Sequence, residues 1–165
     1  MLGSKQTEKQ GARGARSRPH PTIAEVMDAD PPTVTPETTL YVAAGLFLER
    51  DVGDLVVVDS SRHVLGLLST DDVHALVGDL PKAMREEPTA AQLRATPVRI
   101  LLSKVITTTK KDTPLYAAAF LLAHRDVNLL PVVDTDERLV GAANRIDVIE
   151  SLSHASPPQA RPPQP

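Results

Sequence analysis

Two short motifs combine a small polar side chain with a carboxylate three residues later. Ser69 precedes Asp72 in this way, and Asn144 precedes Asp147. At a helix start such a pair can form a capping box, in which each side chain accepts a hydrogen bond from the other residue's backbone. The free N–H groups there also attract anions, and a carboxylate can accept hydrogen bonds from two neighbouring hydroxyl groups. The motifs therefore indicate helix caps, a site for a polar ligand, or both.

Other residue types that carry out catalysis are missing or badly spaced. The chain has no Cys, which excludes disulfides, thiolate metal sites and cysteine nucleophiles. Its five His residues lack the spacing of metal ligands. The sequence contains neither a Gly-x-Ser-x-Gly elbow nor a Gly-rich phosphate loop that ends in Gly-Lys-Ser/Thr. We therefore expect a protein that is not an enzyme, holds no metal and requires no cofactor.

Charge is distributed unevenly along the 165 residues, whose net charge is −3. Residues 1–21 carry five basic side chains against one acid, and residues 22–153 carry 12 basic and 20 acidic side chains. The basic tail, and the Pro-rich residues 154–165, are predicted to be disordered. The first tail could contact nucleic acid, although a solubilising tail is the simpler interpretation. An acidic body is itself a poor surface for phosphates.

An internal repeat is the strongest pattern in the sequence. A shift of 75 positions aligns residues 22–73 with residues 97–148 without a gap and gives 17 identities in 52 positions. Each copy has a short helical segment, a short strand, an amphipathic helix, two further strands and a final helix. The amphipathic helices are expected at 40–50 and 115–125, and the short strand of the second copy at 105–109. The fold class is therefore α/β, with two β-α-β-β-α repeats.

The repeats divide the chain into five parts. Residues 1–21 form the basic tail, 22–78 the first repeat, 79–96 a linker, 97–153 the second repeat, and 154–165 the Pro-rich tail. The linker is expected to hold the tail of a helix, a loop and at most one short helix. No apolar run reaches the roughly 18–20 residues of a membrane helix, and the N-terminus has no apolar signal core. With the lack of Cys, these features predict a cytoplasmic protein that does not enter a membrane.

The repeated unit resembles the cystathionine β-synthase-type (CBS) domain, and two in tandem resemble a Bateman module. The similarity covers about 130 residues. It is carried mainly by the run from Gly66 to Asp72, which fits the family signature of Gly, two apolar residues, Ser or Thr, two free positions and Asp. The run from Gly141 to Asp147 is the second copy. The resemblance implies two repeats packed around a pseudo-twofold axis, with two clefts between them, and commonly a homodimer.

The resemblance also implies adenine nucleotides as ligands, and it assigns roles to particular residues. Asp72 and Asp147 would hold a ribose, Ser69 and Asn144 would assist, and Arg145 is the best phosphate partner in the chain. The adenine slot of one cleft would use Thr33, Val34, Leu55 and Val57, and that of the other would use Thr108, Leu130, Pro131 and Val132. Three residues depart from the pattern: Val56 replaces the Pro found at Pro131, Asn144 replaces a hydroxyl residue, and Asp54 stands where an apolar residue is usual.

These implications support one interpretation and leave others open. The first is a regulatory module without enzymatic activity that senses AMP, ADP, ATP or S-adenosylmethionine and passes the change to a separate effector protein. A ligand alters such a module only by binding its two states with different affinities. The alternative is a structural or dimerisation scaffold with empty clefts, supported by Val56 and Asn144, which depart from the family pattern. Nucleic-acid contact through the basic tail is a further alternative.

Overall fold

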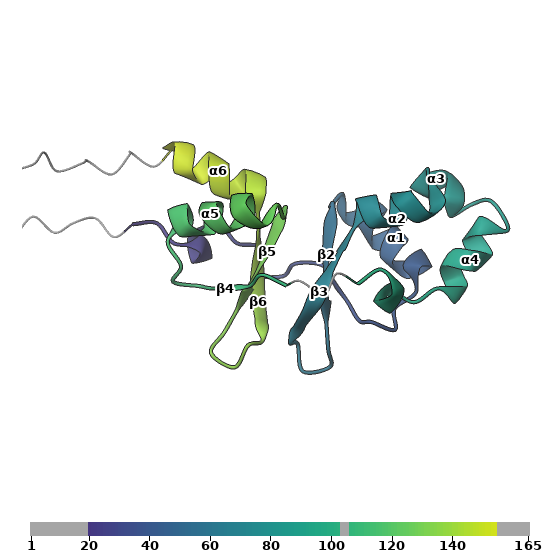
Figure 1. Cartoon of the computed structure of the whole chain (residues 1–165), viewed down its shortest axis with the longest axis horizontal. Helices are drawn as coiled ribbons and strands as arrows, with labels where there is room; N and C mark the ends of the chain where they lie inside the picture. The colour runs from purple at the N-terminus through teal and green to yellow at the C-terminus, as the bar shows by residue number, and fades with distance from the viewer. Residues whose placement is uncertain (1–19, 103–105, 155–165) are drawn as a thin grey trace, which may run out of the picture.

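The structure is a computed structural model that describes residues 20–102 and 106–154 (Figure 1). Residues 1–19 and 155–165, which make up nearly all of the two predicted tails, lie outside the described residues. The described part is a mixed α/β fold with two three-stranded sheets and six α-helices. The sheets stand side by side in the middle, and the helices lie on their outer sides (Figure 1).

The two repeats have the predicted β-α-β-β-α order. The first comprises β1 (Thr33–Val34), α1 (Leu40–Arg50), β2 (Asp54–Val58), β3 (Val64–Ser69) and α2 (Thr70–Val77). The second comprises β4 (Thr109–Lys110), α5 (Leu115–Arg125), β5 (Leu129–Val133), β6 (Leu139–Asn144) and α6 (Arg145–His154). The predicted amphipathic helices are confirmed. The predicted strand at 105–109 was placed too early, because only Thr109 of its described residues belongs to β4.

Each sheet is built around its most apolar strand. β2 lies between β1, which runs parallel to it, and β3, which runs antiparallel. β5 lies in the same way between β4 and β6. The register shifts at equivalent places, between Val57 and Val58 and between Val132 and Val133. A central strand that is buried on both faces requires a continuous apolar run, and this is why β2 and β5 could be identified from the sequence.

Three apolar cores hold the fold together. One lies between the first sheet and its helices, and a second lies between the second sheet and its helices. The third joins the two sheets and includes Val56, Val58, Leu139 and Ala142. Successive side chains of a strand point to opposite faces, so Leu55 and Val57 face the helices while Val56 and Val58 face the other sheet.

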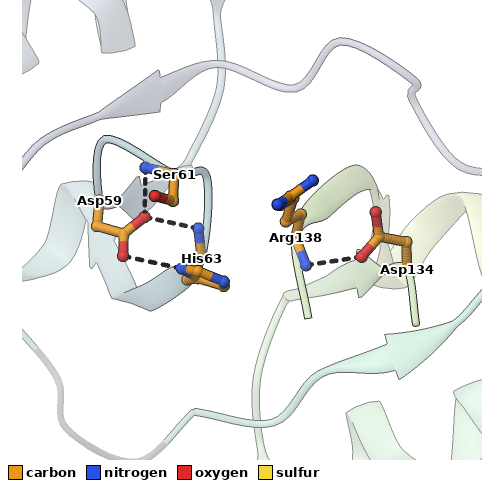
Figure 2. Close-up of polar contacts among 5 residues, drawn as sticks. All are labelled: Asp59, Ser61, His63, Asp134 and Arg138. Atoms are coloured by element: carbon orange, nitrogen blue, oxygen red, sulfur yellow. Dashed lines mark hydrogen bonds and ion pairs between the residues drawn. The ribbon is translucent and has the colours of Figure 1, made fainter. Parts of the chain in front are cut away.

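The hairpin turns of the two repeats meet at one end of the sheets (Figure 2). His63 and Arg138 occupy equivalent positions, 75 residues apart. Their backbones form an isolated antiparallel β-bridge, as equivalent residues beside a twofold axis do. The amide of Leu139 donates to the carbonyl of Arg62 at 2.8 Å. Within the first turn the Asp59 carboxylate accepts hydrogen bonds from the amides of Ser61 and His63. The His63–Arg138 bridge and the bond from Leu139 to Arg62 fix the two sheets to each other at this end.

The first segment of each repeat packs on the opposite repeat. The 3-10 helix Ile23–Glu25 places Ile23 in the core of the second repeat, and its amide donates to the Thr113 carbonyl at 2.9 Å. The 3-10 helix Val98–Ile100 places Val98 in the core of the first repeat, and its amide donates to the Thr38 carbonyl at 2.8 Å. The sequence units and the spatial units therefore differ.

The predicted linker at 79–96 forms part of the first core. It contains two short helices, α3 (Leu80–Ala83) and α4 (Thr89–Ala95), where at most one was expected. They bury Leu80, Ala83, Ala90 and Leu93. The Arg94 guanidinium lies 4.6 Å from the centre of the Tyr41 ring on α1. These contacts cover the part of α1 around Tyr41, whereas Tyr116 and Phe120 on the equivalent helix α5 stay exposed.

Candidate ligand-binding clefts between the repeats

The two motifs lie at the end of the sheets opposite the hairpin turns. Ser69 is the last residue of β3 and Asn144 is the last residue of β6, and a helix begins at the next residue in both repeats. Ser69 pairs with Asp54 at the start of β2, and Asn144 pairs with Leu129 at the start of β5. The strand order therefore brings each motif beside the loop that connects the preceding helix to the central strand.

The Ser69 motif forms the capping box expected from its sequence. The Asp72 amide donates to Ser69 Oγ at 3.1 Å, and the Ser69 amide donates to Asp72 Oδ2 at 3.4 Å. Ser69 Oγ also donates to Asp72 Oδ2 at 2.9 Å. All three bonds leave Asp72 Oδ1 without a hydrogen-bond donor among the described residues. Helix capping and ligand binding are thus compatible at Asp72.

The Asn144 motif caps its helix in a different way. Asn144 Oδ1 accepts a hydrogen bond from the Ile146 amide at 2.8 Å. Within residues 20–102 and 106–154, no hydrogen-bond donor reaches the Asp147 carboxylate. Asp147 is therefore not needed for the cap, and both of its oxygens can accept bonds from a ligand.

A cavity of about 230 Å³, the Asp147 pocket, lies between the two repeats. The second repeat contributes Asn128, Leu129, Ala142, Asn144 and Asp147 to its wall. The first contributes Asp28, Pro31 and Pro32 from the segment before β1, and residues 51–54 from the loop between α1 and β2. Any occupant of this pocket therefore contacts both repeats.

A second cavity of about 240 Å³, the Asp72 pocket, adjoins the first. It is lined by Leu67, Ser69, Asp71 and Asp72 of the first repeat and by residues 126–128 of the second. Asp54 and Asn128 line both pockets. The two motifs thus face neighbouring cavities, as a pair of clefts related by a pseudo-twofold axis would.

Acidic side chains dominate the charge of both cavities. Asp54 is half-buried between them, and its burial, followed by repulsion from Asp71 and Asp72, raises the pKa of its carboxyl above the usual range. Among the residues that the structure describes, no Lys, Arg or His lines either pocket. The described residues also contain no group of three His or acidic side chains that could hold a metal ion.

Arg145, the predicted phosphate partner, is bonded to the end of α5. Its Nε donates to the Val127 carbonyl at 3.0 Å, and its Nη2 donates to the Leu122 carbonyl at 2.8 Å. Nη2 also lies 3.4 Å from Asp126 Oδ1. These bonds hold the guanidinium against the C-terminal end of α5 and the residues that follow it. Contact between Arg145 and a phosphate stays a prediction, and it requires the side chain to leave these acceptors.

The residues predicted for the adenine slots do not line the two cavities. Side chains in the helix-side cores account for most of them: Val34, Leu55, Val57, Leu130 and Val132. Pro131 is buried in β5 opposite Ala142, and Thr33 and Thr108 are half-buried. The choice of Leu55 and Val57 followed the apolar run without deciding which face of the strand points to the helices. A role for these residues in ligand binding stays a prediction.

The cavities contain residues that the sequence analysis did not assign. Asp28, Pro31 and Pro32 reach the Asp147 pocket only because the first segment crosses to the other repeat, which no local pattern indicates. Asp51 and Asp126 carried a signal, since both repeats keep an Asp at this position. Each ends its amphipathic helix in the left-handed conformation, with φ of 52° and 51°, a conformation that Asp tolerates better than most residues.

Comparison with known families confirms the resemblance seen in the motifs. The family model of the CBS domain matches residues 23–79 and again residues 98–154. The chain belongs to the CBS domain family. Its two domains in tandem form a CBS pair, or Bateman module, and the cavities lie between them.

No helix of the described residues is long and apolar enough to cross a bilayer.

Curated relatives include both longer and similarly sized CBS proteins. An uncharacterised protein of Methanocaldococcus jannaschii, MJ1232, is 24% identical over 144 residues, which are 87% of this chain and 44% of that protein. A CBS domain-containing protein of Dictyostelium discoideum is 26% identical over 130 residues, which are 79% of this chain and 90% of that protein. The chain thus spans less than half of MJ1232, and the CBS pair also occurs with little else attached.

Among solved structures, CBSX2 of Arabidopsis thaliana has the same CBS-pair fold. One structure superposes with a TM-score of 0.70 at 26% identity, over 81% of this chain and 94% of that chain. Another, CBSX2 in complex with AMP, has a TM-score of 0.66 at 27% identity and covers 81% of this chain and 96% of that chain. A CBS pair of this architecture can therefore bind an adenine nucleotide.

Proposed function

We propose that this CBS pair is a regulatory module that binds an adenosine-containing ligand in the pockets between its repeats and passes the change to a separate effector protein. The observation that carries the proposal is the position of Asp147. Its carboxylate lines a cavity between the repeats and accepts no hydrogen bond from the described residues. The AMP complex of CBSX2 supports an adenosine-containing molecule as the ligand.

The ribose and the purine of such a ligand each have a partner of fitting chemistry in the Asp147 pocket. The two ribose hydroxyls would donate to the Asp147 carboxylate, and bonds to an ionised acceptor are the stronger class. The purine needs an apolar surface with a few polar groups at its edge, and Pro31, Pro32 and Leu129 supply that surface. Asp72, whose Oδ1 is free of donors within the described residues, would act in the same way in the neighbouring pocket.

Ligand binding would bring the two halves of the module closer together. The Asp147 pocket takes its wall from both repeats, and the hairpin turns already fix the opposite end of the sheets. A ligand that contacts both walls favours whichever arrangement of the repeats gives more contacts, and it shifts the population by that difference in affinity. The effector protein would recognise the favoured arrangement.

Thermal unfolding of the full chain with adenosine, AMP and S-adenosylmethionine tests this function. A ligand at 100 times its Kd stabilises the folded state by about 2.7 kcal/mol, and for a domain of this size that raises Tm by roughly 5–10 °C. We expect such a rise with at least one of the three, and a smaller rise in Asp147→Asn or Asp72→Asn.

The matched control for these variants is Asp136→Asn. Asp136 is exposed in the hairpin turn at the opposite end of the sheets, so this substitution should leave the ligand-induced rise unchanged. If none of the three ligands raises Tm at millimolar concentration, the proposed function is wrong. The empty scaffold considered from the sequence would then be the better interpretation.

A further inference from the structure

The walls of the two pockets are unusually acidic for cavities expected to hold a nucleotide. The Asp147 pocket has four carboxylates in its wall, those of Asp28, Asp51, Asp54 and Asp147. The Asp72 pocket also has four, those of Asp54, Asp71, Asp72 and Asp126. One carboxylate in each pocket is needed for a ribose. The others place negative charge around whatever group the ribose carries.

Asp54 contributes to both pockets and is specific to the first repeat. Its equivalent in the second repeat is Leu129, which lines the same cavity with an apolar side chain. Asp54 starts β2 directly opposite Ser69, so its carboxylate lies beside the first motif and near Asp71 and Asp72. A half-buried carboxylate at this point repels an anion in either pocket, because repulsion between like charges is stronger where water is partly excluded.

The residue directly after Ser69 or Asn144 holds the position from which a cation could offset this charge. In both repeats its side chain is hydrogen-bonded elsewhere. In the second repeat, Arg145 donates to the carbonyls of Leu122 and Val127 at the end of α5. In the first repeat the equivalent residue is Thr70, which carries no charge. Its amide donates to the Gly53 carbonyl at 2.8 Å and its hydroxyl to the same atom at 3.3 Å. Among the described residues, the pockets thus gain no cation from either position.

We infer that these pockets select adenosine derivatives whose 5′ substituent is uncharged or cationic, and that they bind the phosphate esters AMP, ADP and ATP poorly. This inference rests on the proposed function and specifies its ligand class. Adenosine and 5′-methylthioadenosine are uncharged at this position, and S-adenosylmethionine carries a sulfonium. A 5′ phosphate would instead bring up to two negative charges among the Asp side chains.

Calorimetric titration of the full chain with adenosine, AMP, ATP and S-adenosylmethionine tests the inference. We expect adenosine or S-adenosylmethionine to bind at least tenfold more tightly than AMP at 50 mM salt. The ratio should narrow at 500 mM salt, because salt screens the repulsion. ATP without Mg²⁺, whose phosphate chain carries more negative charge than the single phosphate of AMP, should bind no more tightly than AMP.

The variant Asp54→Asn removes the carboxylate that the two pockets share. It should raise the affinity for AMP relative to that for adenosine by severalfold, whereas Asp136→Asn should leave this ratio unchanged. If Asp54→Asn fails to fold, Asp71→Asn serves the same purpose, because Asp71 lines the Asp72 pocket at the exposed start of α2.

The outcomes separate this inference from the proposed function. If AMP binds as tightly as adenosine and S-adenosylmethionine, the inference is wrong while the proposed function stands. If adenosine binds well and AMP poorly, but Asp54→Asn and Asp71→Asn leave that ratio unchanged, the acidic wall is not the cause and the inference is wrong. If no member of the series binds, the proposed function fails and the inference fails with it.

Discussion

Asp28 and Ala142 exchange two backbone hydrogen bonds, each with an N···O distance of 2.9 Å. Asp28 belongs to the segment before β1, and Ala142 lies in β6 of the other repeat, so the bridge joins residues far apart in sequence. It holds residues 28–32 across the edge of the second sheet, where Pro31 and Pro32 close the Asp147 pocket. The shape of this pocket therefore depends on the crossing of the first segment.

The glycine of the second signature motif allows that crossing. A Cβ atom on Gly141 would lie 2.7 Å from Met27 Sδ and 2.8 Å from the Asp28 carbonyl oxygen. The sulfur can move, but the carbonyl is backbone and is held by the hydrogen bond that it accepts from the Ala142 amide. We expect Gly141→Ala to lower the free energy of unfolding by about 1–3 kcal/mol, as overpacking does, and to weaken adenosine binding, measured by urea unfolding and calorimetry.

Gly53→Ala is the matched control for this substitution. A Cβ atom on Gly53 would meet nothing within 4 Å, although Gly53 also lines the Asp147 pocket. Its free energy of unfolding should stay within about 0.5 kcal/mol of the wild type, as is usual for substitutions that disturb no packing. Equal loss of stability in both variants would show that the close approach to Asp28 is not what requires a glycine at position 141.

Because the first segment of each repeat packs on the opposite repeat, a substitution in that segment should destabilise the core of the opposite repeat. Ile23 is fully buried in the second core, so Ile23→Ala should cost about 2–5 kcal/mol. Hydrogen exchange should rise mainly in α5 and β5, whereas Val98→Ala should raise it mainly in α1 and β2 because Val98 lies in the first core. If hydrogen exchange in Ile23→Ala rose only in α1 and β2, this would contradict the packing of the first segment on the opposite repeat.

The shifted pKa of Asp54 predicts how stability responds to pH. Because the folded pKa is above 3.8, the folded state binds more protons than the unfolded state between the two values, and stability falls as pH rises through that window. Asp54→Asn should therefore raise the free energy of unfolding at pH 7, by at most about 1 kcal/mol for a half-exposed carboxyl. The gain should shrink as the pH is lowered toward 4.

Urea unfolding of the wild type and of Asp54→Asn at pH 7, 5.5 and 4 measures this effect. Half-buried Asp59 is a useful contrast, because its bond to the His63 side chain lowers its pKa. The stabilisation that Asp59 contributes is fully present above pH 3.8, the ordinary pKa of an Asp carboxyl, and is lost as the pH falls through its lowered pKa. A loss of stability in Asp54→Asn at pH 7 would mean that the carboxylate is held by favourable contacts instead of being repelled.

Arg145 provides a test of whether this cation supports the fold or the ligand. Its bonds to the carbonyls of Leu122 in α5 and of Val127 just after the helix predict that Arg145→Ala lowers the free energy of unfolding by about 1.5–3 kcal/mol, the range for hydrogen bonds to charged groups. Adenosine binding, measured by calorimetry at a temperature where the variant is folded, should change less than threefold. Loss of AMP affinity with unchanged stability would instead support a phosphate contact.

Local patterns were sufficient to predict most of the fold. Apolar residues at helical spacing identified α1 and α5, and the continuous runs at 55–58 and 129–133 identified the central strands. These patterns succeed because the buried face of each element is determined by its own spacing. The crossing of the first segments could not be predicted in this way. Ile23 is apolar and could be buried in either core, and no spacing in the sequence indicates which one it enters.

The same distinction explains the outcome for the candidate site. The placement of Ser69, Asp72, Asn144 and Asp147 around neighbouring pockets follows from a strand-to-helix turn within each repeat, so their sequence motif was sufficient. Asp28 and Pro32 depend on a contact between distant segments and left no local signal. Leu55 and Val57 lie outside both pockets because strand alternation directs them toward the helices, and their predicted contact with adenine stays a prediction.

Binding of adenosine between the repeats is the central claim, and amide chemical-shift mapping tests it most directly. Titration of the ¹⁵N-labelled full chain with adenosine should shift the amides of Gly53, Asn128 and Asn144, which come from both repeats around the Asp147 pocket. The same titration of Asp147→Asn should give much smaller shifts there. Absence of shifts at saturating adenosine, or shifts confined to a region away from both pockets, would contradict the account.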